Sequence, residues 1–351
     1  MITNNPYEFS YLGLLKAILE KGYDTGDRTG VGTRALPGYA YQIPLVMDDN
    51  GIIKDFPLLT TKKVFLRGTF EELMWKLKGD TNIRALVEKD VHIWTEWPFK
   101  KWLEATGELN KFTWYKDEEK SDWSDEWKKR IKEFEHKILT NAAFAKRWGD
   151  LGPTYGHHMR NFGQIEARYL NTSLRQQISD AGIKLHDDDI VVEGIDQLQA
   201  VLDTIRNKPT DRRVIMSLWN PHDNKNTLLP PCPCFYQFFP NQEGYLHLNV
   251  YQRSCDTFLG VPFNDSQDAL LLILMSIVTG RKTGMFNHFF GDVHIYNNHR
   301  KQVELQLSRE PRQLPNLQIT KKTDNIFDFV FEDLKLLNYD PHPGIKAPVA
   351  V

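Results

Sequence analysis

Two segments in the first hundred residues place hydrophobic side chains at helical spacing. Residues 8–21 (EFSYLGLLKAILEK) repeat them every three or four positions and run into Gly22, which predicts a helix that ends there. A glycine-punctuated loop at 26–34 follows, and strand-like alternation comes after it. Residues 69–79 (TFEELMWKLKG) predict an amphipathic helix with Thr69 as its N-cap, because glutamates follow two and three residues later.

Strand-like segments dominate the second half of the chain. Residues 212–220, 234–239 and 246–254 are rich in β-branched and aromatic side chains and predict three strands. Residues 268–280 (DALLLILMSIVTG) are apolar on all sides but too short to span a bilayer, so they predict a helix buried in the core. Because strands and helices do not alternate as regular βαβ units, the expected fold class is α+β.

Two segments differ in composition from the rest. Residues 98–150 are dense in charged side chains interleaved with Trp and Phe, which is typical of a surface helical insertion with its own small core. Residues 165–196 predict a second polar excursion. Residues 1–97 and 151–351 are therefore expected to form one domain, and 98–150 a small charged helical insertion.

Composition restricts the classes of function. The 351 residues carry 44 Lys and Arg against 46 Asp and Glu, a net charge of −2, which argues against a dedicated nucleic-acid-binding protein. No apolar run approaches the roughly 20 residues of a membrane helix, and the N-terminal residues lack the pattern of a signal peptide. Three cysteines suggest no disulfide framework, so we expect a reducing, cytoplasmic compartment.

Cys232 is the first candidate for chemistry, because it follows Pro230 and Pro231 at the entry to a predicted strand. Proline fixes φ, so this backbone can present a thiol in one position. Two other interpretations stay open, a small buried hydrophobic side chain and a metal site. The metal site would join Cys232 to Cys234, Cys255 and either His294 or His299.

A polar loop is predicted between the strand at 246–254 and the buried helix. Arg253 and Ser254 offer a planar guanidinium and a hydroxyl, which suit a phosphate or a carboxylate. Asp256 and Asn264 flank the apolar stretch LGVPF and can also face a ligand. The alternative is an ordinary turn with a surface ion pair.

Two pairs of residues gain meaning from strand geometry. Arg212 and Arg213 open the strand at 212–220, where adjacent residues point to opposite faces. Either one of them is structural, or the pair reaches across a subunit boundary. His294 and Tyr296 are two residues apart, so on a strand they share a face and can bind one sugar hydroxyl.

Trp94 and Trp97, in the sequence IWTEW, form a third pair. Their spacing makes the two indoles neighbours on a helix and a candidate stacking platform. Each of these signals is weak alone, but together and in this order they are specific.

Ten segments occur in order along the chain: DRTGVGT, FPLLTTKK, EELMWKLKGDTNI, IWTEW, LGPTYG, DRRVIMSLWN, PPC, QRSCDTFLGVPFN, GDVHIYNNH and DPHPGIKAPVAV. Together they resemble the thymidylate synthase family over essentially the whole chain. The resemblance implies an α+β fold whose large mixed β-sheet forms the interface of an obligate homodimer. It also implies a single catalytic domain that transfers a one-carbon unit from 5,10-methylenetetrahydrofolate to C5 of a pyrimidine deoxynucleotide monophosphate, without a metal.

The resemblance assigns catalytic roles by position. Cys232 matches the nucleophile that adds to C6 of the pyrimidine and makes C5 reactive. A free thiol is mostly protonated at neutral pH, so nearby cations are expected to lower the pKa of Cys232, and Arg253 can do this while it binds phosphate. Glu72 matches the carboxylate that manages proton transfers, and Tyr155 matches the tyrosine implicated in removing the C5 proton.

Other positions match ligand-binding residues of the family. Arg28 and Ser254 match phosphate ligands, and Arg212 and Arg213 match a pair donated by the partner subunit. The ribose hydroxyls are matched by His294 and Tyr296. The folate site is matched by Trp94, Trp97, Asp256 and the C-terminal Val351, which closes over the folate and excludes water.

Asn264 matches the residue that reads the base. Its amide can donate to uracil O4 and accept from N3–H, whereas cytosine reverses both groups. The related phage deoxycytidylate hydroxymethylases carry Asp at this position. Asn264 therefore favours dUMP over dCMP, and the neighbouring Asp265 leaves a shift toward dCMP open.

Four departures from the synthase pattern surround this site. They are Pro233 after the nucleophile, Met159 in place of Trp, residues 265–268 in place of Ile-Ala-Ser-Tyr, and Phe290 in place of Gly. Attack of water on the exocyclic methylene needs new polar groups, and Asp265, Gln267, Asp268 or His158 could orient that water. The departures favour hydroxymethylation of dUMP, with release of tetrahydrofolate.

The intact C-terminal sequence PGIKAPVAV resembles instead the synthase lid that keeps water out. The alternative is thymidylate synthesis proper, in which dUMP is reductively methylated to dTMP and dihydrofolate is released. A hydroxymethylase would suggest a phage that modifies its DNA, with the enzyme in the host cytoplasm. Neither alternative needs a membrane or a nucleic acid.

Overall fold

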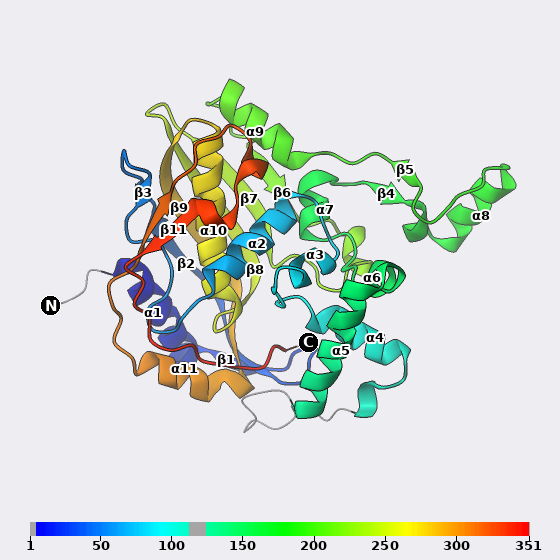
Figure 1. The fold of residues 1–351 in the computed structure, drawn as a ribbon, viewed down its shortest axis with the longest axis horizontal. Coiled ribbons are helices and arrows are strands. Elements are labelled where there is room, and N and C mark those ends of the chain that lie inside the picture. The colour runs from blue at the N-terminus through cyan, green and yellow to red at the C-terminus, as the bar shows by residue number, and fades with distance from the viewer. Residues whose placement is uncertain (1–4, 112–123, 351) are drawn as a thin grey trace.

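A six-stranded mixed sheet forms the centre of the protein (Figure 1). The computed structural model describes residues 5–111 and 124–350 of the chain. Strands β8 and β9 of the central sheet run parallel, and its other neighbouring strands are antiparallel. Its order is β1 (Tyr23–Thr25), β2 (Thr33–Pro44), β9 (Lys282–Tyr296), β8 (Tyr245–Asp256), β7 (Pro233–Pro240) and β6 (Ile215–Ser217). Smaller sheets join β11 (Leu334–Leu337), β10 (Asn316–Ile319) and β3 (Ile52–Ile53), and β4 (Ile165–Glu166) with β5 (Ile190–Val192).

Helices pack on one face of the central sheet. α10 (Gly260–Val278) contacts β8 and β9, α1 (Pro6–Lys21) contacts β2, and α2 (Leu66–Leu77) packs against α10. By length and composition α10 could cross a membrane, but 83% of its most apolar 18-residue window is buried inside the protein. Such burial is typical of a core helix, as the sequence predicted for this segment.

The other helices surround this core. The α-helices are α3 (Arg84–Val87), α4 (Glu96–Ala105), α5 (Asp125–Thr140), α6 (Ala142–Trp148), α7 (Tyr155–Arg160), α8 (Thr172–Asp180), α9 (Gln197–Asn207) and α11 (Arg300–Leu307). Short 3-10 turns are η1 (Leu109–Lys111), η2 (Ala167–Tyr169), η3 (Asp223–Lys225), η4 (Asn297–His299), η5 (Ile326–Asp328) and η6 (Phe331–Asp333). The mixture of one large mixed sheet with helices confirms the α+β class.

Helices α4, α5 and α6 pack around an aromatic cluster. Phe99 and Trp102 on α4 lie 5.6 and 5.5 Å from the ring of Phe134 on α5, and Phe144 on α6 completes the group. Among the described residues, these buried rings are continuous with the main core. Residues 112–123 of that segment lie outside the described residues.

Strands β4 and β5 and helix α8 form an arm that projects away from the sheet (Figure 1). The sequence predicts a polar excursion here. Strand β5 nevertheless exposes three apolar side chains, Ile190, Val191 and Val192. The arm is therefore more apolar at its surface than its average composition indicates.

Three local predictions are wrong. Helix α2 begins at Leu66, and Thr69 lies inside it, where its hydroxyl donates to the carbonyl of Phe65 instead of capping the helix. The stretch LGVPF is not a loop but leads into the first turn of α10, where proline is tolerated because the first N–H groups have no helical partner. Strand β6 begins at Ile215, so Arg212 and Arg213 precede it.

The N-terminal half of α10 buries four consecutive polar side chains, Asp265, Ser266, Gln267 and Asp268. Burial raises the pKa of Asp268 to about 8, although the Lys76 ammonium acts in the opposite direction. Asp268 is therefore largely protonated in the folded protein at neutral pH, and its charged form is disfavoured by the fold.

We predict that Asp268→Asn stabilises the protein at pH 8. In the unfolded chain Asp268 ionises near its ordinary pKa of 3.8, so the native state of the wild type loses stability as the pH rises from about 4 to about 8. The variant lacks this loss, so its Tm should exceed that of the wild type by several degrees at pH 8 and by little near pH 4. Thermal unfolding at both pH values measures this gain.

The exposed Asp180→Asn serves as the control and should leave the pH dependence of Tm as it is in the wild type. A Tm difference between Asp268→Asn and the wild type that is the same at pH 4 and pH 8 would contradict a protonated Asp268.

Candidate active site

Cys232 lies directly before β7, and its backbone is held from two sides. Its peptide N–H donates to the Tyr155 hydroxyl at 2.8 Å, and its carbonyl accepts from the Arg253 N–H at 2.9 Å. The Arg253 guanidinium donates to the carbonyls of Pro230 and Pro231 and lies 3.9 Å from Cys232 Sγ. The prolines and these hydrogen bonds together fix where the thiol can be.

Cys232 is the least buried of the three cysteines. The residue is half-buried, whereas Cys234 and Cys255 are buried. This difference favours Cys232 over the other two as the reactive residue. Among residues 5–111 and 124–350, no group of three or more His, Cys, Asp or Glu side chains is arranged to hold a metal ion, so the geometry gives no support to the Cys-x-Cys metal site.

The charge environment of the thiol differs from the expectation. Burial raises the pKa of Cys232 above its ordinary value, while Arg253, Tyr155, Lys76 and Arg28 act in the opposite direction. The expected cations are present, but their effect is smaller than the cost of ionising a buried thiol. In the protein without ligands, Cys232 is therefore mainly a thiol at neutral pH.

Glu72 on α2 is held by three N–H groups. Trp94 Nε1 donates to its Oε1 at 2.8 Å, the Lys76 ammonium lies 2.8 Å from the same oxygen, and Gln267 Nε2 donates to its Oε2 at 2.7 Å. Lys76 also donates to Gln267 Oε1 at 2.8 Å, which closes a ring of polar contacts. Three donors around two oxygens match a carboxylate and fix its direction.

An aromatic wall connects Glu72 to Cys232. The Trp94 ring lies 5.2 Å from that of Trp97 and 5.6 Å from that of Tyr155, so the predicted indole pair is confirmed as neighbours. Trp94 lies in the turn before α4 rather than on it. Burial, followed by the charge of Cys232, raises the pKa of Tyr155 well above its ordinary value, so its hydroxyl keeps its proton.

The end of β9 presents His294 and Tyr296 on one face, as predicted. Their rings are 5.2 Å apart, and His294 Nδ1 lies 2.8 Å from Asp292 Oδ1. Asp256, at the end of the neighbouring β8, pairs in register with His294 and accepts hydrogen bonds from the peptide N–H groups of Phe258 and Leu259. These side chains therefore lie together at the carboxyl ends of two neighbouring parallel strands.

Arg28, Ser254 and Asn264 border the same region. Arg28 is exposed in a loop ordered by Asp27, which accepts from the N–H of Gly32 at 2.8 Å, and its charge acts on the pKa of Cys232. Ser254 follows Arg253 on β8, and Asn264 is half-buried on the second turn of α10.

The predicted residues that are not brought to this region are Arg212 and Arg213. Both are exposed, and Arg213 pairs with Asp211 at 2.9 Å. The carbonyl of Arg212 accepts from Gln237 Nε2, five residues along the chain from Cys232, a separation of about 17 Å on a strand. They do not reach Cys232 of their own chain by this path. Val351 lies outside the described residues.

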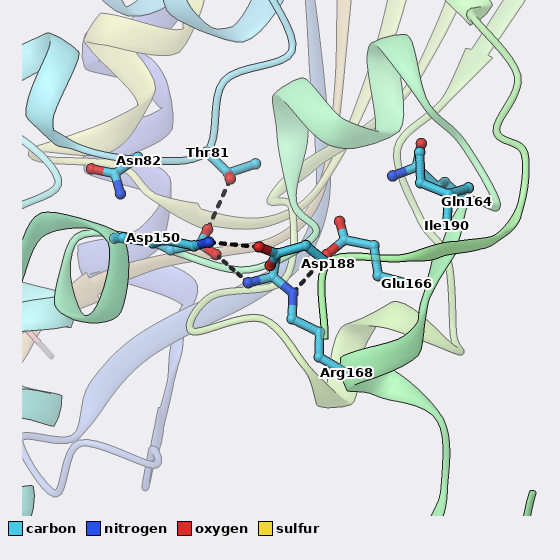
Figure 2. A pocket seen from close by; sticks show the side chains of 9 residues that line it. Thr81, Asn82, Asp150, Gln164, Glu166, Arg168, Asp188 and Ile190 are labelled. Atoms are coloured by element: carbon cyan, nitrogen blue, oxygen red, sulfur yellow. Dashed lines mark hydrogen bonds and ion pairs between the residues drawn. The ribbon is translucent and has the colours of Figure 1, made fainter. Parts of the chain in front are cut away.

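A separate polar pocket lies where the arm meets the body (Figure 2). Its charged side chains pair with one another. Arg168 lies 3.3 Å from Asp150 and 2.7 Å from Glu166, and Lys146 lies 2.5 Å from Asp188. The pocket contains none of the predicted site residues, and its ion pairs join the arm to the body.

Comparison with known proteins agrees with the arrangement around Cys232. The thymidylate synthase family profile matches residues 9–351. A thymidylate synthase from Mycoplasma mobile is 41% identical over 344 residues, which cover 97% of this chain and 99% of that protein. The chain belongs to the thymidylate synthase family. It is an enzyme that transfers a one-carbon group, as the resemblance implied.

The departures from the synthase pattern turn out to have partners inside the protein. Asp265 accepts from the hydroxyls of Tyr7 and Tyr41, and His158 lies 3.1 Å from Asp223 with both side chains buried. Gln267 is occupied by Glu72 and Lys76, as described above. The carboxyl group of Asp265 and the amide of Gln267 are thus occupied by protein partners, whereas Asp268 Oδ2 and His158 Nδ1 are buried without a hydrogen-bond partner among the described residues. Asp265 and Gln267 are therefore not available to orient a water molecule. The thymidylate synthase alternative fits the family matches better.

Sequence reasoning missed Lys76, Gln252 and His288. Lys76 is nearly fully buried and lies over the Tyr155 ring as well as beside Glu72. In the sequence it follows Glu72 by four residues, the spacing of a helical ion pair, which was the available signal. Gln252 and His288 give no local signal, because their partners are distant along the chain.

We predict that iodoacetamide alkylation of Cys232 accelerates about tenfold for each pH unit between 7 and 9, because the thiolate is the reactive form and the pKa is raised. Arg253→Gln should move the curve to still higher pH, since it removes the charge that opposes this rise. Mass spectrometry of the peptide containing residue 232 measures the rate, and Cys232→Ser identifies the background. A rate that levels off below pH 8 would contradict the raised pKa.

Proposed function

We propose that this enzyme reductively methylates dUMP to dTMP, with 5,10-methylenetetrahydrofolate as cosubstrate and dihydrofolate as coproduct. The observation that carries the proposal is the position of the Cys232 thiol against Arg253 and Tyr155 in a member of the thymidylate synthase family. The folate derivative supplies the one-carbon unit and the hydride that turns this unit into a methyl group.

In this proposal the residues around Cys232 bind and activate the nucleotide. Sγ adds to C6 of the pyrimidine, and the electron pair moves onto C5 and O4. Arg253 stays beside the sulfur and binds the phosphate together with Arg28 and Ser254. Bond formation uses the thiolate, so ligand binding must offset the raised pKa of Cys232.

Proton movements and folate binding belong to the wall formed by Glu72, Trp94, Trp97 and Tyr155. The two indoles and the Tyr155 ring provide flat surfaces that fit a pterin ring, and Asp256 can accept from it. Glu72 is positioned to exchange protons with bound ligands. The neutral Tyr155 hydroxyl would relay the C5 proton, accepting it on oxygen while it releases its own proton to water. His294 and Tyr296 would bind the ribose hydroxyl.

The C-terminal segment supports a closed, water-excluding site. His299 is buried, and its Nε2 lies 2.8 Å from the carbonyl oxygen of Pro348, while its Nδ1 lies 4.0 Å from Asp256. The segment before Val351 is therefore anchored beside a proposed folate ligand. Exclusion of water favours hydride transfer over the attack of water that hydroxymethylation requires.

We also propose that the enzyme acts as a homodimer. Phe235, Tyr251 and Phe289 lie side by side in register on three neighbouring strands and are exposed on the sheet face opposite α10. Such a row of exposed aromatic side chains is typical of a protein interface. Dimerisation through this face would let Arg212 and Arg213 of one protomer reach the phosphate in the other. Its family relationship supports a cytoplasmic location.

The reaction is tested by incubation of the purified protein with dUMP and 5,10-methylenetetrahydrofolate. We expect dTMP by mass spectrometry and an equal amount of dihydrofolate by absorbance. Cys232→Ala should lower turnover by about 10⁴-fold or more, because the nucleophile acts as a unit with its partners. Cys234→Ala, a matched loss of a thiol two residues away, should retain most turnover.

Formation of 5-hydroxymethyl-dUMP and tetrahydrofolate instead would contradict the proposal and support the interpretation as a hydroxymethylase. Turnover by Cys232→Ala close to that of the wild type would reject the nucleophile.

If each active site contains residues of both protomers, activity should return when two inactive variants are mixed. Cys232→Ala and Arg213→Glu each remove one half of the site, but a heterodimer joins an intact Cys232 to an intact Arg213 of the other chain. After the chains exchange, we expect about a quarter of wild-type turnover, since half of the dimers carry one complete site of two. If the mixture stays as inactive as its parts although the chains have exchanged, Arg213 does not act across subunits.

A further inference from the structure

A buried chain of hydrogen bonds lies behind Asn264. Gln252 on β8 donates from Nε2 to Asn264 Oδ1 at 3.3 Å and to the carbonyl oxygen of Ser254 at 3.0 Å. Because a carbonyl oxygen only accepts, the Ser254 contact fixes which end of the Gln252 amide is nitrogen. Gln252 is almost fully buried, so this orientation cannot be exchanged for contacts with water.

The other end of the Gln252 amide contacts His288 on β9. His288 Nε2 lies 3.1 Å from Gln252 Oε1, and its Nδ1 lies 2.7 Å from Asp265 Oδ1. An amide oxygen accepts only, so Nε2 carries a hydrogen, and one proton lies between Nδ1 and the Asp265 carboxyl group. His288 and Asp265 are both fully buried.

Two tyrosines hold the far end of the chain. Tyr41 and Tyr7 donate to Asp265 Oδ2 at 2.5 and 3.0 Å. Burial, and then the charge of Asp265, raises the pKa of both hydroxyls well above the ordinary value, so both remain donors. The Phe290 ring stacks on His288 with centroids 3.9 Å apart and holds the imidazole in its plane.

We propose that this relay, from Asp265 through His288 and Gln252, locks the Asn264 amide in the orientation that accepts uracil and rejects cytosine. The inference rests on the proposed binding of dUMP and names what determines the choice of base. His288 and Asp265 are positioning residues, because they act through Gln252 and do not contact the nucleotide.

The direction of the relay produces the selectivity. It ends in an N–H that points at Asn264 Oδ1, so turning the amide over would bring two N–H groups together in a buried place. In the locked orientation Nδ2 can donate to uracil O4, while Oδ1 has a second lone pair for uracil N3–H. Cytosine presents an amino group and an unprotonated N3 at these points, which match only the reversed amide.

The relay therefore includes Asp265 and Phe290, two of the departures from the synthase pattern. The sequence leaves open whether Asp265 shifts the preference toward dCMP. In the structure its carboxyl group is turned away from the base side of Asn264 and reaches that amide only through His288 and Gln252. The relay therefore strengthens the preference for uracil.

The experiment measures the dissociation constants of dUMP and dCMP by calorimetry on the intact protein, and kcat/KM for both nucleotides. His288→Gln should lower the preference for dUMP over dCMP by about tenfold, the worth of about one hydrogen bond. Asp265→Asn is the conservative control, because its amide nitrogen can donate to Nδ1 while its oxygen accepts from the tyrosines. It should keep the wild-type preference.

Two more variants keep the test decisive. Gln252→Glu has nearly the same shape and places oxygen where Nε2 was, so Asn264 should turn and the preference should move toward dCMP even if His288→Gln does not fold. His158→Gln breaks another buried His–Asp pair, with Asp223, and should leave the ratio of the two dissociation constants unchanged.

If His288→Gln leaves the ratio of the dCMP and dUMP dissociation constants unchanged, the relay is wrong, even if both nucleotides bind more weakly. If His288→Gln does not fold, the same result in Gln252→Glu would overturn the relay. Binding does not depend on turnover, which separates this inference from the proposed reaction. A wild type that binds dUMP selectively but forms no dTMP would contradict the reaction and leave the relay supported.

Discussion

The burial of polar groups on α10 constrains the rest of this structure. A polar atom buried on this helix costs about 1–3 kcal/mol if it has no partner. Asp265 finds its partners on α1, β2 and β9, and Gln267 finds its partners on α2, so one helix joins the central sheet to the elements packed on it. The same contacts reach the two functional amide and carboxylate groups, Asn264 and Glu72. Two sets of buried hydrogen bonds on α10 therefore connect the core to the active site.

These hydrogen bonds explain how a buried carboxyl group is tolerated at position 265. An aspartate at position 265 would be costly without hydroxyl donors at positions 7 and 41 and an imidazole at position 288. Lys76 and Gln267 satisfy Glu72 in the same way. Each of these polar residues, considered alone, suggests a hydrated site. Its hydrogen bonds in the structure are made to protein groups instead of water.

The sequence predicted well whatever depends on local pattern. Gly22 ends α1, the apolar run at 268–280 is a core helix, and His294 and Tyr296 share a face because spacing on a strand decides it. The motif order identified the family, which the matched profile confirms. The failures concern tertiary contacts. Thr69 lies inside α2, and the pKa of Cys232 is raised because burial, which no short motif reports, exceeds the effect of the cations. The role of His288 could not be predicted from a local pattern, because its partners are 23 and 36 residues away along the chain.

The rigid setting of the nucleophile determines how such a scaffold can change. Prolines at 230, 231 and 233 and the hydrogen bonds from Arg253 hold the backbone that carries the sulfur in one position. The reacting ring must therefore come to the thiol, guided by the surrounding side chains. A substrate of another shape would need changes in those side chains, because the backbone of the nucleophile cannot follow it.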